Sequence, residues 1–251
     1  MKNSLFKIIN LLYNRLKYPN VKYYGSPKKL VLMGIWHRKI FDGYNSQLGQ
    51  DEFIYKELIE NQENKIIKLF IDVGCNHPIT HSNSLFFEKN QGYKVVAIDA
   101  LEGIKNLWGR ERPNSLFIET AVGDMPGTVD FEIVQGGEIE SMFSAVSGAS
   151  NKATNHTKKL KTVQVRTLAE ILSSLSISAA GVVSIDIEGY ELNAIKGIDF
   201  KKFRSQIFII ENNRNNGLGD NLIRDYLISK GYVYYARIWN LDDIFVDQNL
   251  I

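Results

Sequence analysis

The 251-residue sequence contains little cysteine and no long apolar stretch, and both shortages limit what the protein can be. Its one cysteine, Cys75, rules out an internal disulfide framework, as is typical of a reducing compartment. No apolar run approaches the roughly 20 residues that a membrane-spanning helix requires. The N-terminal apolar stretch is interrupted by Lys7, Asn10 and Asn14 and lacks a small-residue cleavage site. We therefore expect a cytoplasmic protein, long enough for one large α/β domain.

Acidic residues are absent from the first 41 positions, although the whole chain carries a net charge of only +2. Nine Lys and Arg residues precede the first acid, Asp42, so residues 1–42 carry +8 and the remainder carries −6. Such a basic arm favours an anionic neighbour, for example a membrane surface, an acidic glycan or a protein partner. No basic and aromatic stripe continues beyond it, so nucleic acid is not an expected partner.

Two interpretations of the N-terminal segment stay open. Residues 3–17 have the spacing of an amphipathic helix. This helix could pack on protein, either its own domain or a second subunit of a homo-oligomer, or it could lie at a membrane interface. We treat residues 1–62 as a basic extension that packs on the core or on a partner. Residues 63–251 then form the main domain.

The rest of the chain is organised around residues 69–102. Leu69-Phe70-Ile71 is typical of a buried parallel strand, and Asp72 to Asn76 form a turn in which Gly74 allows a close backbone approach. Ser82 or Asn83 is the expected cap of a helix that runs through Glu88. A second apolar strand, 93–98, ends at Asp99, where a carboxylate suits the hydroxyls of a ribose.

This pattern indicates a nucleoside cofactor, and two classes compete for it. A dinucleotide site favours the sequence G-x-G-x-x-G, so that a pyrophosphate can sit on a helix N-terminus. The turn here contains one glycine, Gly74, followed by Cys75-Asn76-His77-Pro78. S-adenosylmethionine has no phosphate, and an acidic turn can face its cationic end. The turn therefore favours S-adenosylmethionine.

The remaining segments alternate between strand and helix patterns. We expect strands at 115–122, 127–134, 162–165, 181–186 and 206–210, followed by a closing hairpin at 232–238 and 243–246. We expect helices at 51–61, 102–110, 168–175, 190–196 and 221–230. Residues 135–161 are rich in Gly, Ser, Asn and Lys, and a connection of this length is usually functional. We interpret it as a mobile loop over the substrate, with Glu138, Ser141 and Ser144 near its start.

Four stretches of the chain resemble the FkbM-type methyltransferases. They are FIDVGCNHP with VVAIDA, the TAVGD segment, VRTLAEIL followed by VVSIDIEGYELNAIKGIDF, and FIIENN. The resemblance covers roughly residues 66–247. With the order of strands and helices, it implies a class I methyltransferase (Rossmann-like) α/β fold that has a mostly parallel seven-stranded sheet and a C-terminal antiparallel hairpin. The N-terminal segment, which lies outside the resemblance, is expected to add a helical or strand extension. The resemblance also implies S-adenosylmethionine-dependent O-methylation of a sugar, a glycan or a glycosylated metabolite.

The resemblance assigns roles to particular residues. Asp72 and Gly74 would lie beside the methionine part of the cofactor, Asp99 would hold the ribose, and Asp186 would stand between cofactor and substrate. Further expected cofactor contacts are Cys75, Asn76, Ala100, Val122 and Asp124, the last two beside the adenine. Many family members have a glycine near Pro78, so the His77-Pro78 pair leaves the shape of the turn after Asn76 open.

Methyl transfer to a hydroxyl needs a group that removes the hydroxyl proton. The candidates are the four residues Asp186, Glu188, Glu211 and His77, although Glu188 could instead cap the helix that follows it. Asp186 and Glu211, with Asn212, would also form an all-oxygen site suited to Mg²⁺. Two other functions remain as alternatives: a nicotinamide-dependent nucleotide-sugar oxidoreductase, and a non-catalytic interaction module with a methyltransferase fold.

Overall fold

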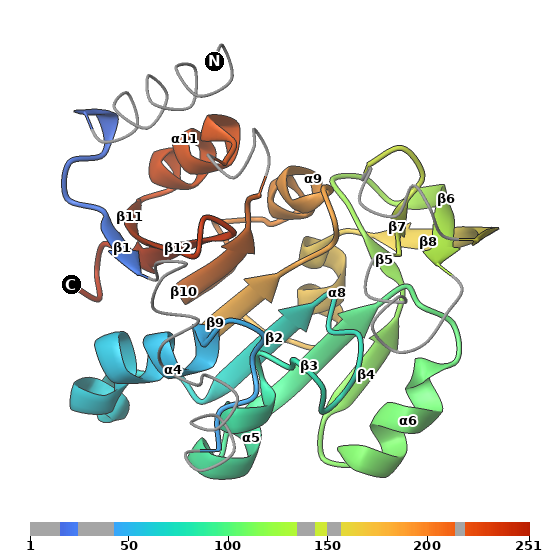
Figure 1. Cartoon of the computed structure of the whole chain (residues 1–251), viewed down its shortest axis with the longest axis horizontal. Coiled ribbons are helices and arrows are strands. Elements are labelled where there is room, and N and C mark those ends of the chain that lie inside the picture. Colours follow the sequence, from blue (N-terminus) through green and yellow to red (C-terminus); the bar gives the residue numbers. More distant parts are fainter. Residues whose placement is uncertain (1–15, 25–42, 135–143, 150–156, 214–218) are drawn as a thin grey trace.

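The computed structural model describes residues 16–24, 43–134, 144–149, 157–213 and 219–251 (Figure 1). A central sheet runs through this part of the molecule. Its eight strands, in spatial order, are β1 (Lys22–Tyr24), β11 (Tyr232–Ile238), β12 (Asp242–Asp247), β10 (Arg204–Glu211), β9 (Ala179–Ile185), β2 (Leu69–Val73), β3 (Lys94–Asp99) and β4 (Leu116–Glu119). β12 runs antiparallel to β10 and β11, while the other neighbouring pairs are parallel. The predicted α/β class, with its mostly parallel sheet and C-terminal hairpin, is confirmed.

The expected seven strands are joined by an eighth, because β1 adds to the open edge of the hairpin. Lys22–Tyr24 pairs in parallel with Ala236–Ile238 of β11. Just before it, the ring of Tyr18 meets that of Tyr234 edge-on, with centroids 5.2 Å apart. The sequence does not predict that Lys22–Tyr24 joins the central sheet. Most of the predicted 3–17 helix lies outside the described residues, as do residues 25–42.

Helices cover both faces of the central sheet, which gives three layers (Figure 1). One face carries α8 (Leu168–Ser174), α9 (Glu191–Lys196) and α11 (Asn221–Ser229), and the other carries α4 (Gln50–Ile54), a π turn (Tyr55–Ile59), a 3-10 turn (Glu60–Lys65), α5 (Leu85–Gln91) and α6 (Ile104–Glu111). Along β2, Ile71 packs on the α8 side and Phe70 on the α5 side. This alternation buries both faces of the strand, as expected for a covered parallel sheet.

Several helix boundaries differ from the sequence prediction. The helix predicted over 51–61 is broken into three short helical turns. α5 begins after Ser84, not after Ser82 or Asn83, and it ends at Gly92 with a left-handed φ of 68°. The predicted helix 168–175 is observed as α8, and it begins with a full capping box, in which Thr167 and Glu170 satisfy each other's backbone N–H groups.

A second sheet lies beside the first and was not predicted (Figure 1). Its strand order is β5 (Ala121–Val122), β8 (Lys158–Arg166), β6 (Gly127–Val134) and β7 (Ala145–Val146). The expected strand 115–122 is therefore split at Thr120, whose N–H donates to the Asp99 carbonyl at 2.8 Å. Within the predicted loop 135–161, β7 and the start of β8 are strands, so the expectation of a loop is wrong for these residues, while Ser144 lines the cavity described below. Glu138 and Ser141 lie outside the described residues.

Candidate functional site

A cavity of about 290 Å³ opens where the parallel strands β2, β3, β9 and β10 end. Four residues that follow or end these strands line it: Gly74, Asp99, Asp186 and Glu211. Ligands of parallel α/β sheets collect at this edge, because the connecting turns leave a crevice there. The cavity therefore lies where the strand order places a binding site.

The Gly74 turn is packed directly against the end of β9. Gly74 has a φ of 78°, and a Cβ atom built on it would lie 1.7 Å from the Asp186 carbonyl oxygen. The Gly74 N–H donates to the Ile98 carbonyl at 2.8 Å, and the Asp186 N–H donates to the Val73 carbonyl at 2.9 Å. Glycine is required here for both its backbone angle and its lack of a side chain.

Asp99 organises the neighbouring strand end. Its Oδ2 accepts from the Asn76 N–H and its Oδ1 from the Leu101 N–H, both at 2.8 Å. Burial raises the pKa of the Asp99 carboxyl, while these two N–H groups act in the opposite direction. Each carboxylate oxygen has a second lone pair, so Asp99 retains capacity to accept from a ligand hydroxyl.

One side of the cavity is apolar. Beyond Asp99, its lining includes Ala100, Leu101, Ala121, Val122, Phe131 and Val146. Phe131 and Val146 come from β6 and β7, so the second sheet completes this side of the cavity. A flat heteroaromatic ring fits such a surface, because its faces gain from apolar burial.

The opposite side of the cavity is acidic. Asp186, Glu188 and Glu211 each place a carboxylate oxygen within 4.8 Å of the other two, and Asp186 is the most exposed of the three. Glu188 has a left-handed φ of 54° and Gly189 one of 103°, which defines the sharp turn between β9 and α9. Glu191 Oε1 holds this turn by accepting from the Gly189 N–H at 2.7 Å and the Ile187 N–H at 3.3 Å. Glu188 lines the cavity. It is not the N-cap residue of α9, because that position is held by Tyr190, whose side chain makes no capping hydrogen bond.

Further acids surround Glu211. Asp242 is its register partner on β12, and burial, reinforced by the charge of Glu211, raises the pKa of Asp242 to about 7. Burial and the same charge raise the pKa of Glu191. Asn213 Nδ2 donates to Glu211 Oε1 at 2.5 Å, and Gln50 Nε2 donates to Asp242 Oδ2 at 2.8 Å. Amide donors therefore hold two of these acids, Glu211 and Asp242.

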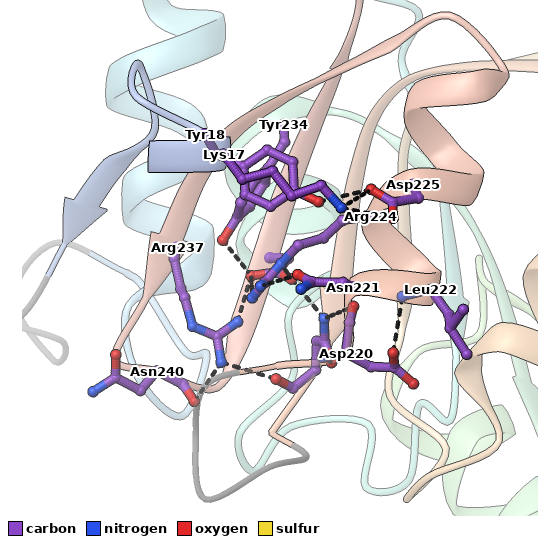
Figure 2. Close-up of polar contacts among 12 residues, drawn as sticks. Lys17, Tyr18, Asp220, Asn221, Leu222, Arg224, Asp225, Tyr234, Arg237 and Asn240 are labelled. Carbon is purple, nitrogen blue, oxygen red and sulfur yellow. Dashed lines mark hydrogen bonds and ion pairs between the residues drawn. The ribbon is translucent and has the colours of Figure 1, made fainter. Parts of the chain in front are cut away.

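A buried ionic network fixes the backbone next to Glu211 (Figure 2). Asp243 accepts from Arg224 Nε at 2.8 Å, from Tyr234 Oη at 2.8 Å and from Arg237 Nη1. Arg237 Nη2 donates to the Asn212 carbonyl at 2.9 Å. Asn212 Nδ2 donates to Asp243 at 2.7 Å. The Asn212 side-chain amide is therefore committed to this network, whereas the carboxylates that come together at the cavity are those of Asp186, Glu188 and Glu211.

A comparison with models of protein families shows which family the chain belongs to. The model of the "Methyltransferase FkbM domain" matches residues 72–234, about two thirds of the chain. The chain belongs to the FkbM methyltransferase domain family. No curated protein matches the chain.

Two solved structures resemble the FkbM domain at low identity. One is the methyltransferase FkbM from Methylobacillus flagellatus KT, with 15% identity, a TM-score of 0.42, and coverage of 70% of this chain and 42% of that one. The other is a TehB-like SAM-dependent methyltransferase from Corynebacterium glutamicum, with 10% identity, a TM-score of 0.42, and coverage of 88% and 100%. The chain thus spans less than half the length of the first.

The structure brings many of the sequence-predicted residues of the FkbM domain to the cavity. The lining includes Gly74, Asn76, Asp99, Ala100, Val122, Asp186, Glu188 and Glu211. Asp72, Cys75, His77 and Asp124 do not line it. His77 Nδ1 accepts from the backbone N–H groups of Ile79 and Thr80, at 3.1 and 2.9 Å, so it shapes the turn. Asp72 is buried behind the turn, where burial raises its pKa to about 6.

Other lining residues escaped the sequence reasoning. Gln47, Thr120, Phe131, Tyr190 and Leu241 also face the cavity. Tyr190 lies within the SIDIEGYE stretch, so its position in that motif was an available signal. Gln47 precedes the region of family resemblance, and Phe131 reaches the cavity through the unpredicted second sheet, so neither carried a signal.

Proposed function

We propose that the protein is an S-adenosylmethionine-dependent O-methyltransferase that acts on a hydroxyl of a sugar, a glycan or a glycosylated metabolite. The observation that carries this proposal is the division of the cavity. An apolar side next to Asp99 suits a nucleoside, and an acidic side at Asp186 suits a hydroxyl that must lose a proton. Family membership supports the methyl-transfer class.

The residues fit the cofactor. Gly74 lets the turn after β2 lie directly against the end of β9 at the cavity, Asp99 offers carboxylate lone pairs to the ribose, and Val122 with Phe131 offers an apolar surface to the adenine. When bound, S-adenosylmethionine supplies a methyl group on a sulfonium, which is already a good leaving group. The protein's task is then to align the acceptor oxygen and to remove its proton.

The acidic side provides the groups for that proton. Asp186 is the most exposed of the three carboxylates and follows the strand beside Gly74, so we assign it as the proton acceptor. Glu188 and Glu211 flank it and accept hydrogen bonds from neighbouring hydroxyls of the acceptor. An acceptor rich in hydroxyls, such as a sugar, matches this set of hydrogen-bond acceptors.

Three carboxylates this close repel one another unless a proton or a cation lies between them. If Mg²⁺ fills this role, dialysis against EDTA should reduce methyl transfer at least about tenfold, because the hydroxyl loses its Lewis acid. The activity of the wild-type protein should return when Mg²⁺ is added back, whereas the activity of the Asp186→Asn variant should not. Unchanged activity after exhaustive chelation would exclude the metal and leave Asp186 acting alone.

The cofactor assignment is tested by calorimetric titration with S-adenosylhomocysteine. We expect wild-type protein to bind it, and Asp99→Asn to bind at least about tenfold more weakly, because the amide loses a charge-assisted hydrogen bond to the ribose. Asp130→Asn, on the exposed part of β6, is the control and should bind normally. Undiminished affinity in Asp99→Asn would show that the ribose assignment is wrong. Absence of binding by folded wild-type protein would favour the non-catalytic module.

A further inference from the structure

Two buried side chains of the α6 segment hold the turn that follows Gly74. The indole Nε1 of Trp108 donates to the Asn76 carbonyl oxygen at 2.7 Å, and Trp108 is 1% exposed. The N–H of the same residue, Asn76, donates to Asp99. Asn76 is therefore fixed on both sides, by the carboxylate at the end of β3 and by the indole from α6.

Arg112 lies one helical turn after Trp108 and holds the rest of the same segment. Its Nη1 donates to the Pro78 carbonyl at 3.2 Å, to Ser82 Oγ at 3.1 Å and to Ser84 Oγ at 3.0 Å. Its Nε pairs with Glu88 of α5, and its guanidinium lies 4.5 Å from the centre of the Trp108 ring. One buried guanidinium thus joins the beginning of the turn to the start of α5.

The turn needs such support because it contains non-glycine residues in strained backbone positions. Asn76 has a φ of 41° and His81 one of 58°, and both residues line the cavity. A left-handed φ is unfavourable for a residue with a Cβ and persists only where surrounding contacts enforce it. Trp108 and Arg112 supply these contacts from outside the turn.

We propose that Trp108 and Arg112 are positioning residues for the cofactor half of the site. Trp108 holds Asn76 so that its N–H orients Asp99, and Arg112 holds the following segment from Pro78 to Ser84. Together they replace the conformational control that additional glycines give to other nucleoside-binding turns. Neither side chain lines the cavity, so both act through the turn that they hold. This inference rests on the proposed function, because it assigns a role in binding the proposed cofactor.

Trp108→Phe is the sharpest test, because it retains a buried aromatic ring and removes the indole N–H together with the second ring of the indole. We expect the affinity for S-adenosylhomocysteine, measured by calorimetry well below the unfolding temperature, to fall about tenfold, since the Asn76 carbonyl loses its partner. Arg112→Lys should weaken binding to a similar degree, because an ammonium cannot reproduce the fork of a guanidinium.

Arg204→Lys is the matched control. Arg204 also pairs with a carboxylate, Asp247, donates to the Lys230 carbonyl at 2.6 Å and stacks on Tyr232 at 4.3 Å, but at the opposite end of the sheet. The Arg204→Lys substitution should lower the melting temperature and leave the affinity for S-adenosylhomocysteine unchanged. Equal affinity in wild type, Trp108→Phe and Arg112→Lys, or an equal loss in Arg204→Lys, would overturn the positioning role. A wild-type protein that does not bind S-adenosylhomocysteine would overturn the proposed function together with this inference.

Discussion

Asp243→Asn is expected to lower the free energy of unfolding by about 3–5 kcal/mol. Asp243 is fully buried, and its carboxylate faces two buried guanidinium groups, Arg224 and Arg237, together with the Tyr234 hydroxyl (Figure 2). The asparagine keeps the shape but removes the charge, which leaves two buried cations without their shared counter-ion. Removal of one partner from a buried ion pair is strongly destabilising for this reason. Urea denaturation at neutral pH measures the change.

Asp225→Asn is the matched control for this prediction. Asp225, on α11, pairs with Lys17 at 2.8 Å and accepts from Tyr18 Oη, but its side chain is 50% exposed. Solvent screens an ion pair of this kind, so the expected loss is below about 1 kcal/mol. A comparable loss in the two variants would show that burial of the Asp243 network does not determine its contribution.

The Asp243 network also explains how the acidic side of the cavity keeps its shape. Arg237 holds the Asn212 carbonyl, Asp243 holds the Asn212 side chain, and the Asn212 N–H donates to the Leu241 carbonyl at 2.6 Å. Asn212 lies between Glu211 and Asn213, both of which line the cavity. The stretch FIIENN, which carries part of the family resemblance, marked this segment as a candidate part of the site. The network that fixes it depends on residues of β11 and β12, which a single sequence does not place beside it.

The central strands could be predicted because both of their faces are buried. β2, β3, β9 and β10 read as nearly continuous apolar runs, and each was expected within about two residues of its observed bounds. β8 differs, since Lys158–Arg166 alternates between exposed and partly buried positions and contains several charges. Its polarity resembles that of a loop, and the pairing with β6 that makes it a strand is a long-range interaction.

Four of the predicted site residues that line the cavity share one property, namely that they end or follow parallel strands. Gly74, Asp99, Asp186 and Glu211 converge for this topological reason. His77 was chosen for its chemistry, yet the turn uses its Nδ1 to accept backbone N–H groups. Trp108 and Arg112 were not singled out for the site, because their contacts depend on how α6 packs against a turn about 30 residues earlier in the chain.

Gly74→Ala is expected to have the second large effect, a loss of about 2–5 kcal/mol in the free energy of unfolding. The added Cβ would lie 1.7 Å from the Asp186 carbonyl oxygen, which belongs to the backbone and cannot rotate away. The φ of 78° adds backbone strain. Relief requires that β2 and β9 separate at the cavity, so any folded fraction should also bind S-adenosylhomocysteine more weakly.

Gly92→Ala separates these two causes. Gly92 ends α5 with a φ of 68°, close to that of Gly74, but a Cβ built there meets no atom within 4 Å. Its expected loss is therefore that of the backbone strain alone, about 1 kcal/mol, with unchanged binding of S-adenosylhomocysteine. If the two variants lost equal stability, the close approach of Gly74 to Asp186 would not be what requires glycine. A larger loss in Gly74→Ala, accompanied by weaker binding, would link the cofactor turn directly to the strand that carries Asp186.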